Sequence, residues 1–146
     1  MPGVRAVAHA VIRHRDRLLV TSGIDAGNEY YRCVGGGIEL GERAEQAVRR
    51  ELREELDVEL SRAELLGVIE NLFDFEGRPH HEIVFAFDCV VADPAFYDRG
   101  VHDVVEHGTV IEQARWVALA DFSSGKRLVP DGLLQLIRQS SAYQSA

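Results

Sequence analysis

Three glutamates lie close together on one predicted helix. Residues 42–56 contain no Gly or Pro and have a helical composition, and Glu51, Glu54 and Glu55 fall in the second half. At about 100° per residue, Glu51 and Glu55 lie one turn apart and Glu54 lies beside them. Two like charges about 4 Å apart repel by about 4 kcal/mol at an effective dielectric of 20. The carboxylates must therefore point into solvent, pair with arginines, or bind divalent cations.

Three consecutive glycines, Gly35 to Gly37, come just before this helix. Glycine lets the backbone approach a ligand closely and leaves its carbonyl groups accessible to a metal. Oxygen ligands with room for water suit Mg²⁺ or Mn²⁺. The alternative is a solvated helix face with Glu–Arg pairs, the usual meaning of a charge run. The glycines favour the metal site.

The elements that must position these residues are predicted from the apolar pattern. Strands are predicted at residues 4–12, 18–20, 30–34, 66–75, 81–91 and 115–118. The fourth and fifth of these form a hairpin through residues 76–79.

Between these strands, residues 23–29 and 93–108 are predicted to be loops, and Ser61 with Glu64 has the spacing of a capping box at a short turn. Residues 131–139 form an amphipathic helix. Strands and helices mixed with hairpins predict an α/β or α+β fold, in a single domain over residues 1–146.

Composition excludes several classes of function. The chain has 16 basic and 24 acidic residues, a net charge of −8 and a pI near 5.2. This charge disfavours binding to a nucleic acid polymer or an anionic membrane, both of which favour a basic surface. An acidic protein can still bind phosphates when metal ions mediate the contact.

Nothing in the sequence suggests a membrane or secreted protein. The longest apolar runs, such as residues 83–87, are far shorter than the ~20 residues of a membrane-spanning helix, and residues 1–5 contain no apolar signal core. Cys33 and Cys89 lie in predicted strands, where two buried thiols are expected rather than a disulfide. We therefore expect a cytoplasmic protein.

The sequence resembles the Nudix hydrolase family. The family's box has Gly, five residues, Glu, seven residues, and then Arg-Glu-hydrophobic-any-Glu-Glu-any-Gly-hydrophobic. Its positions are occupied here by Gly36, Glu42, Arg50, Glu51, Leu52, Glu54, Glu55 and Val58. Flanking strands and the last helix extend the resemblance over most of the chain. Asp57 departs from the box, because the family has Gly there, and Asp tolerates the left-handed conformation better than most residues.

The resemblance implies a Nudix-like α/β/α sandwich around a mixed sheet. It also implies hydrolysis of a pyrophosphate bond in a nucleotide or nucleotide derivative, with Mg²⁺ or Mn²⁺. By analogy, Glu54 and Glu55 are metal ligands, Glu51 is a ligand or the base, and the Gly35 carbonyl is a further ligand. Glu42 and Arg50 would hold the glycine loop and the helix in register.

The base often lies outside the helix in this family. Glu112 is the first candidate, followed by Glu106 and Glu82, although each could be an ordinary surface carboxylate. Arg32 could reach a phosphate or pair with an acid, and Phe75 could stack on a base or pack in the core.

The glycines Gly36 and Gly37 are also expected beside the substrate. Two substrate marks of family subgroups, a Pro at position 73 and a Tyr near position 75, are absent. A homodimer is a family-level expectation. The competing hypotheses are a Nudix-like sensor that binds a nucleotide without cleaving it and an acidic interaction domain.

Overall fold

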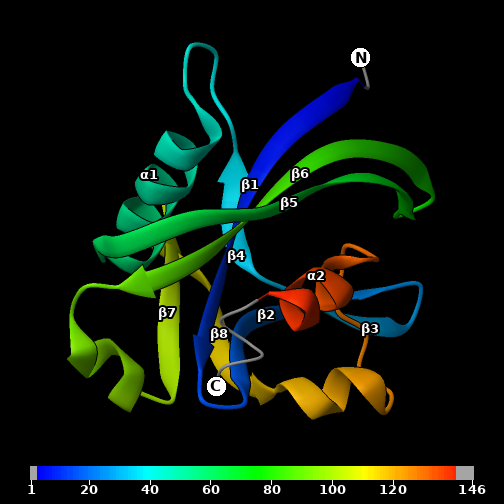
Figure 1. The fold of residues 1–146 in the computed structure, drawn as a ribbon. Helices are drawn as coiled ribbons and strands as arrows, with labels where there is room; N and C mark the ends of the chain where they lie inside the picture. The colour runs from blue at the N-terminus through cyan, green and yellow to red at the C-terminus, as the bar shows by residue number, and fades with distance from the viewer. Residues whose placement is uncertain (1–2, 141–146) are drawn as a thin grey trace.

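One mixed sheet organises the chain (Figure 1). The computed structural model describes residues 3–140, so residues 1–2 and 141–146 of the predicted domain lie outside the described residues. The strand order is β5-β6-β1-β2-β8-β7, with β3 paired to β2 and β4 paired to β1. The strands are β1 (Val4–His14), β2 (Arg17–Asp25), β3 (Asn28–Arg32), β4 (Val34–Gly37), β5 (Leu60–Phe75), β6 (Arg78–Val91), β7 (Val101–Glu106) and β8 (Thr109–Ala118).

Helices cover both faces of the sheet. The helices are α1 (Ala44–Leu56) and α2 (Leu133–Gln139), with short 3₁₀ turns η1 (Pro94–Asp98) and η2 (Leu119–Ser123). Successive residues of a strand point to opposite faces. Ala10 and Ile12 of β1 therefore pack with Leu52 of α1, whereas Val11 packs with Ile137 of α2. The predicted α+β fold is confirmed, because β1 pairs parallel with β6 and antiparallel with β2 and β4.

The long β5–β6 hairpin arches over the rest of the sheet (Figure 1). At its tip, Asp25 Oδ1 accepts a hydrogen bond of 3.0 Å from the Glu76 backbone N–H. The Tyr30 and Phe75 rings meet edge to face, 6.4 Å apart. The predicted hairpin is thus confirmed, and its tip is tied to the β2–β3 hairpin.

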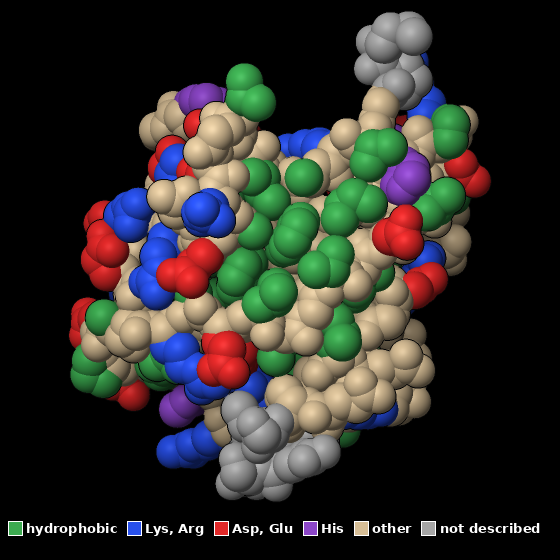
Figure 2. Space-filling view, turned by 45° about the horizontal axis from the view of Figure 1, so that its top comes forward, with side chains coloured by type: hydrophobic (Ala, Val, Ile, Leu, Met, Phe, Trp, Pro, Cys, Tyr) green, Lys and Arg blue, Asp and Glu red, His purple; other side chains and the backbone are tan. Residues whose placement is uncertain are grey.

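The outer face of the arch is apolar. Leu65, Val68 and Leu72 of β5 are at least 48% exposed, and hydrophobic side chains gather across the face shown in Figure 2. This face is opposite to the one that carries Asn71 and Phe73, because strand residues alternate.

Three local predictions were wrong. Residues 23–29 are not a loop, since β2 runs to Asp25 and β3 starts at Asn28. A Cβ at Gly23 would overlap the Tyr30 side chain of the paired strand, so this glycine permits a close strand contact rather than a turn. Ser61 lies within β5 instead of capping a turn.

The third error concerns residues 93–108, predicted as a loop, which contain η1 and β7. Within β7, His102 and Val104 are buried while Val101 and Asp103 are exposed. This alternation is a strand pattern that a polar composition concealed.

Helix α1 ends as the sequence suggested. It starts at Ala44, two residues after the predicted start, where the Arg43 backbone N–H donates to Gln46 Oε1 at 2.7 Å. Asp57 ends it in the left-handed conformation, with φ 54°. Cys33 and Cys89 are buried and unpaired, as predicted. No helix within residues 3–140 is long and apolar enough to cross a membrane.

The pairing of β4 with β1 leaves no room for a side chain at Gly35. A Cβ there would overlap the Ala8 carbonyl oxygen, and the φ of 155° lies at the edge of the region that favours glycine. Gly35→Ala is therefore expected to lower the free energy of unfolding by about 3 kcal/mol. Gly100→Ala is the control, because a Cβ at Gly100 would meet nothing within 4 Å among the described residues. Urea unfolding of both variants measures the difference, and equal midpoints would contradict this account of β4.

Candidate active site

Arg50 connects the glycine strand to the acidic helix. Its guanidinium donates to the two Glu42 carboxylate oxygens at 2.7 and 2.9 Å, and to the Gly37 carbonyl oxygen at 3.0 Å. It also donates to Glu51 at 3.1 Å and to Glu54 at 3.2 Å. These contacts raise the pKa of Arg50, chiefly through Glu42, and they lower the pKa of Glu42. One planar cation thus fixes the positions of three carboxylates and one carbonyl.

Glu51 lies against the backbone of the glycine strand. Its side chain is only 15% exposed, and a Cβ at Gly36 would lie 2.6 Å from its carboxyl carbon. The absence of a side chain at Gly36 therefore lets a carboxylate reach β4. This contact places the first glutamate of the box beside the glycines, on the face of the sheet that α1 covers.

Glu55 carries a buried oxygen without a partner. Its Oε1 makes no hydrogen bond within the described residues. Burial raises the pKa of Glu55 well above its ordinary value, and the Glu51 and Glu106 carboxylates add to this shift, while the Arg32 guanidinium opposes it. A buried carboxyl oxygen with no donor is costly unless a proton or a cation compensates it.

Glu51, Glu54 and Glu55 have donor atoms that suit a divalent cation, but they are not arranged as a preformed metal site. Within residues 3–140, no three His, Cys, Asp or Glu side chains converge closely enough to hold a metal ion. Glu54 is 59% exposed and pairs with Arg50. The unpartnered oxygen of Glu55 and the neighbouring Glu51 are hard oxygen donors, the type that Mg²⁺ and Mn²⁺ prefer.

The three candidate bases outside the helix, Glu82, Glu106 and Glu112, are called the outer carboxylates here, and they lie in different places. Strand β7 packs against α1 through Val104, and Glu106 follows two residues later and acts on the pKa of Glu55. Glu112 of β8 lies 4.0 Å from Arg32. Glu82 lies on the opposite face of the sheet, 3.9 Å from Arg5. The structure thus connects Glu106 to the acidic helix more directly than it connects Glu112 or Glu82.

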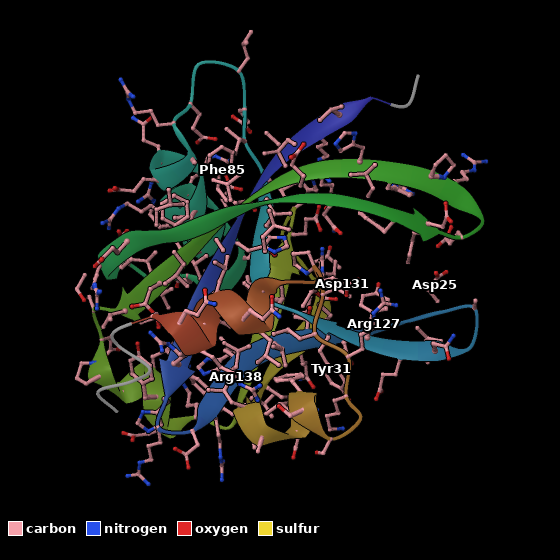
Figure 3. All side chains as sticks on the ribbon, turned by 45° about the vertical axis from the view of Figure 1, so that its right-hand side comes forward. Asp25, Tyr31, Phe85, Arg127, Asp131 and Arg138 are labelled. Carbon is pink, nitrogen blue, oxygen red and sulfur yellow. The ribbon has the colours of Figure 1, made fainter. Side chains whose placement is uncertain are left out.

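A cavity of about 490 Å³ lies between the arch and the β2–β3 hairpin. Arg32 and Phe75, both predicted to face a substrate, line it. Figure 3 shows Arg127 and Asp131 in this region, below the arch. A Cβ at Gly37 would lie 2.9 Å from the guanidinium of Arg5, another lining residue. Arg5 and Arg32 therefore bring positive charge to the end of the cavity nearest β4.

His9 is a lining residue that the sequence analysis missed. It is only 6% exposed, and its Nδ1 has no hydrogen-bond partner within the described residues. Burial, helped by Arg32 and Arg5, lowers the pKa of His9 to about 4, so its imidazole is neutral at pH 7. The available signal was one polar residue within the apolar run of residues 6–12, but only the fold shows that it faces a cavity.

Comparison with known proteins identifies the family. The NUDIX domain family matches residues 2–137, nearly the whole chain. The protein therefore belongs to the NUDIX family, which confirms the resemblance and the prediction of a Nudix-type pyrophosphohydrolase.

Solved structures show the same fold. A MutT NUDIX hydrolase from Burkholderia pseudomallei aligns with a TM-score of 0.68 and 23% identity over 94% of this chain and 99% of that one. A NUDIX hydrolase from Nitrosomonas europaea gives 0.60 and 24% over 94% and 87%. A MutT protein from Methanosarcina mazei gives 0.60 and 19% over 99% and 98%. At these identities the likeness concerns the fold.

The Arg50 contacts predict that lysine cannot replace arginine. Lysine keeps the charge but cannot make the forked contacts to Glu42 while reaching Gly37, Glu51 and Glu54. Arg50→Lys is expected to lower the free energy of unfolding by about 1–3 kcal/mol. Arg53→Lys is the control, because Arg53 is half exposed and its ion pair with Glu59 is long, at 3.4 Å. Chemical unfolding checks this, and a wild-type midpoint for Arg50→Lys would refute the structural role.

Proposed function

We propose that this protein hydrolyses a pyrophosphate bond in a nucleotide or nucleotide derivative, with Mg²⁺ or Mn²⁺ held by Glu51, Glu54 and Glu55. The observation that carries the proposal is the inward position of Glu51 beside the glycine strand, together with the buried Oε1 of Glu55, one helical turn further on, which lacks a partner among the described residues. A purely structural acidic face would place Glu55 in solvent or in an ion pair rather than leave one of its oxygens buried and unpaired.

In this proposal, different residues bind the metal and hold the metal-binding carboxylates in position. Glu51, Glu54, Glu55 and the Gly35 carbonyl would hold the metal. A bound divalent ion would acidify a coordinated water and neutralise phosphate charge. Arg50 keeps Glu51 and Glu54 in place through its contacts to Glu42 and Gly37.

The remaining groups serve the substrate and the proton. Arg5 and Arg32 would bind phosphate oxygens from the cavity side, next to Gly36 and Gly37. Phe75, at the far end of the cavity, would stack on the base. Glu106 is our choice for the outer carboxylate, because it acts on Glu55 from a strand that packs against α1.

The proposal is tested with a substrate panel. Nucleoside di- and triphosphates, nucleotide sugars, ADP-ribose and dinucleoside polyphosphates are assayed with Mg²⁺, with Mn²⁺ and with a chelator. We expect turnover of at least one of these that stops when the metal is removed. Saturable binding without any product would instead indicate the sensor hypothesis.

Glu54→Gln and Glu55→Gln should each lower metal-dependent turnover by about 100-fold or more, since each removes an anionic ligand. Mg²⁺ should raise the melting temperature of the wild type, because it binds only the folded state, and should do so much less in Glu55→Gln. Glu59→Gln, which changes an exposed glutamate just after the helix, is the control. Wild-type turnover in Glu55→Gln would contradict the metal site.

That metal-ligand test has a further readout in the absence of metal. Glu55→Gln should be no less stable than the wild type without metal, because a neutral amide avoids the cost of a buried carboxylate next to Glu51 and Glu106. A large drop in melting temperature would indicate a structural ion-pair role instead.

Glu106 and Glu112 can be separated by one matched pair of variants. Glu106→Gln should lower kcat by about 100-fold if it serves as the outer carboxylate. Glu112→Gln should act mainly on KM, because Glu112 pairs with Arg32. The reverse pattern would restore Glu112 to the role that the sequence analysis gave it.

A further inference from the structure

The outer face of the β5–β6 arch is an apolar surface that the proposed reaction does not use (Figure 2). Its residues form three cross-strand rows over β1, β6 and β5. We call these nine residues the arch face, and the rows are Val4–His81–Leu72, Ala6–Ile83–Glu70 and Ala8–Phe85–Val68. Seven of the nine are apolar, so the face carries only one carboxylate and one imidazole.

Large side chains of the arch face are open to solvent. Val4 is 61% exposed, Leu72 is 70% exposed and Val68 is 48% exposed. Leu65, which precedes the arch face on β5, is 50% exposed. Phe85 is half-buried, because it also packs against the core under α1, beside which Figure 3 shows it. Monomeric proteins seldom expose so many apolar side chains on one continuous surface.

The size of this surface fits a protein interface. From Leu65 to Leu72, at about 3.3 Å per residue, β5 runs for roughly 23 Å, and three strands about 4.8 Å apart are roughly 14 Å wide. A flat area of roughly 300 Å² matches the apolar centre of a standard interface, which covers about 800 Å² per partner once its polar rim is included. A contact of this size supports a dimer that dissociates on dilution rather than an obligate one.

The composition of the arch face favours a second copy of this chain as the partner. The face has no Lys or Arg that would attract an acidic protein or an anionic membrane, and it has only Glu70 to attract a basic protein. Two apolar faces match when a two-fold axis places the same surface of each copy in contact. Since the chain has a net charge of −8, two copies repel least where they meet through a face with one carboxylate.

The arch face lies on the same side of the sheet as the acidic helix but does not contain the candidate site. The row Ala8–Phe85–Val68 continues to Gly36 of β4, where Glu51 lies. Val68 is three strands away from Gly36, which is roughly 14 Å. The cavity lies on the other face of the sheet, so a contact through the arch face leaves it open. The inference below therefore does not depend on the proposed function.

We propose that two copies of this protein form a dimer through their arch faces, in a two-fold symmetric contact. Burying the large apolar side chains of both faces removes them from water and drives the association. The side chains that pack against the other copy are Val4, Val68, Leu72 and Phe85.

Sedimentation equilibrium of the full chain tests the dimer. We expect a monomer–dimer equilibrium with a Kd of roughly 1–100 μM, in keeping with the size of the face. The melting temperature should rise with protein concentration, because dimerisation stabilises the folded state. A protein that stays monomeric at about 1 mM would overturn the proposal.

Leu72→Glu should raise the Kd of the dimer by at least about 30-fold, because it places a charge from each copy in an apolar contact. Ile24→Glu is the matched control, since Ile24 is 71% exposed and lies on β2, outside the arch face. At the lowest protein concentration all three proteins should melt together, which shows that the monomers are folded. A dimer that survives in Leu72→Glu, or is lost equally in Ile24→Glu, would contradict the contact.

Glu70→Gln should act in the opposite direction. It removes the one carboxylate of the arch face and its repulsion of the other copy, so the Kd should fall by about threefold or more. Glu59→Gln makes the same change at an exposed glutamate outside the arch face and should leave the Kd unchanged. An unchanged or higher Kd in Glu70→Gln would count against this face.

Spin labels locate the contact independently of its strength. Cys33 and Cys89 are buried, so Val68→Cys supplies the accessible thiol of the chain. In the dimer, the two labels at this position should lie within roughly 30 Å of each other, given the dimensions of the face. Labels at Ile24→Cys should lie further apart. A shorter distance at Ile24 than at Val68 would place the dimer contact elsewhere and refute the proposal.

Neutral phosphatidylcholine vesicles test a lipid surface as the other occupant of an uncharged apolar face. A monomeric protein that binds these vesicles, and loses the binding in Leu72→Glu but not in Ile24→Glu, would assign the arch face to lipid and overturn the dimer. We expect the wild type to remain in solution as a dimer and not to bind the vesicles.

Discussion

Repulsion among partly buried carboxylates is the constraint on which this structure depends. Glu51 and Glu55 lie on the side of α1 that faces the glycine strand, where water screens their charges poorly. Arg50 offsets part of the cost by binding Glu51, Glu54 and Glu42, and it ties them to the Gly37 carbonyl. What remains is an oxygen of Glu55 without a donor among residues 3–140, which a proton or a cation would compensate.

The glycine strand couples this acidic site to the cavity. In β4, Gly36 admits the Glu51 carboxylate on one face of the sheet, and Gly37 admits the Arg5 guanidinium on the other. β1 shows the same division, because Ala8 belongs to the core under α1 while His9 lines the cavity. The acidic site and the cavity therefore lie on opposite faces of the sheet, beside the same short strand.

Local patterns predicted most elements but not their pairing. The apolar runs located β1, the β5–β6 hairpin and α2, and the helical composition of residues 42–56 located α1. The strand β7 was missed because its short alternating pattern lies in a polar segment, and it is seen only in the pairing with β8. Gly23 was also taken for a loop residue, although its small size serves a contact with Tyr30 that forms only in the folded hairpin.

The sequence by itself determined the family, the fold class and the carboxylates of the box, because residue types at fixed spacings lie on one helix whatever the surroundings. Tertiary structure decided that Glu106 lies near enough to Glu55 to raise its pKa. It also decided that Glu82 faces away from the acidic helix and that His9 lines a cavity. The physical reason is distance along the chain. Helical neighbours are set by local geometry, whereas groups on separate strands meet only through long-range strand pairing and the curl of the β5–β6 arch.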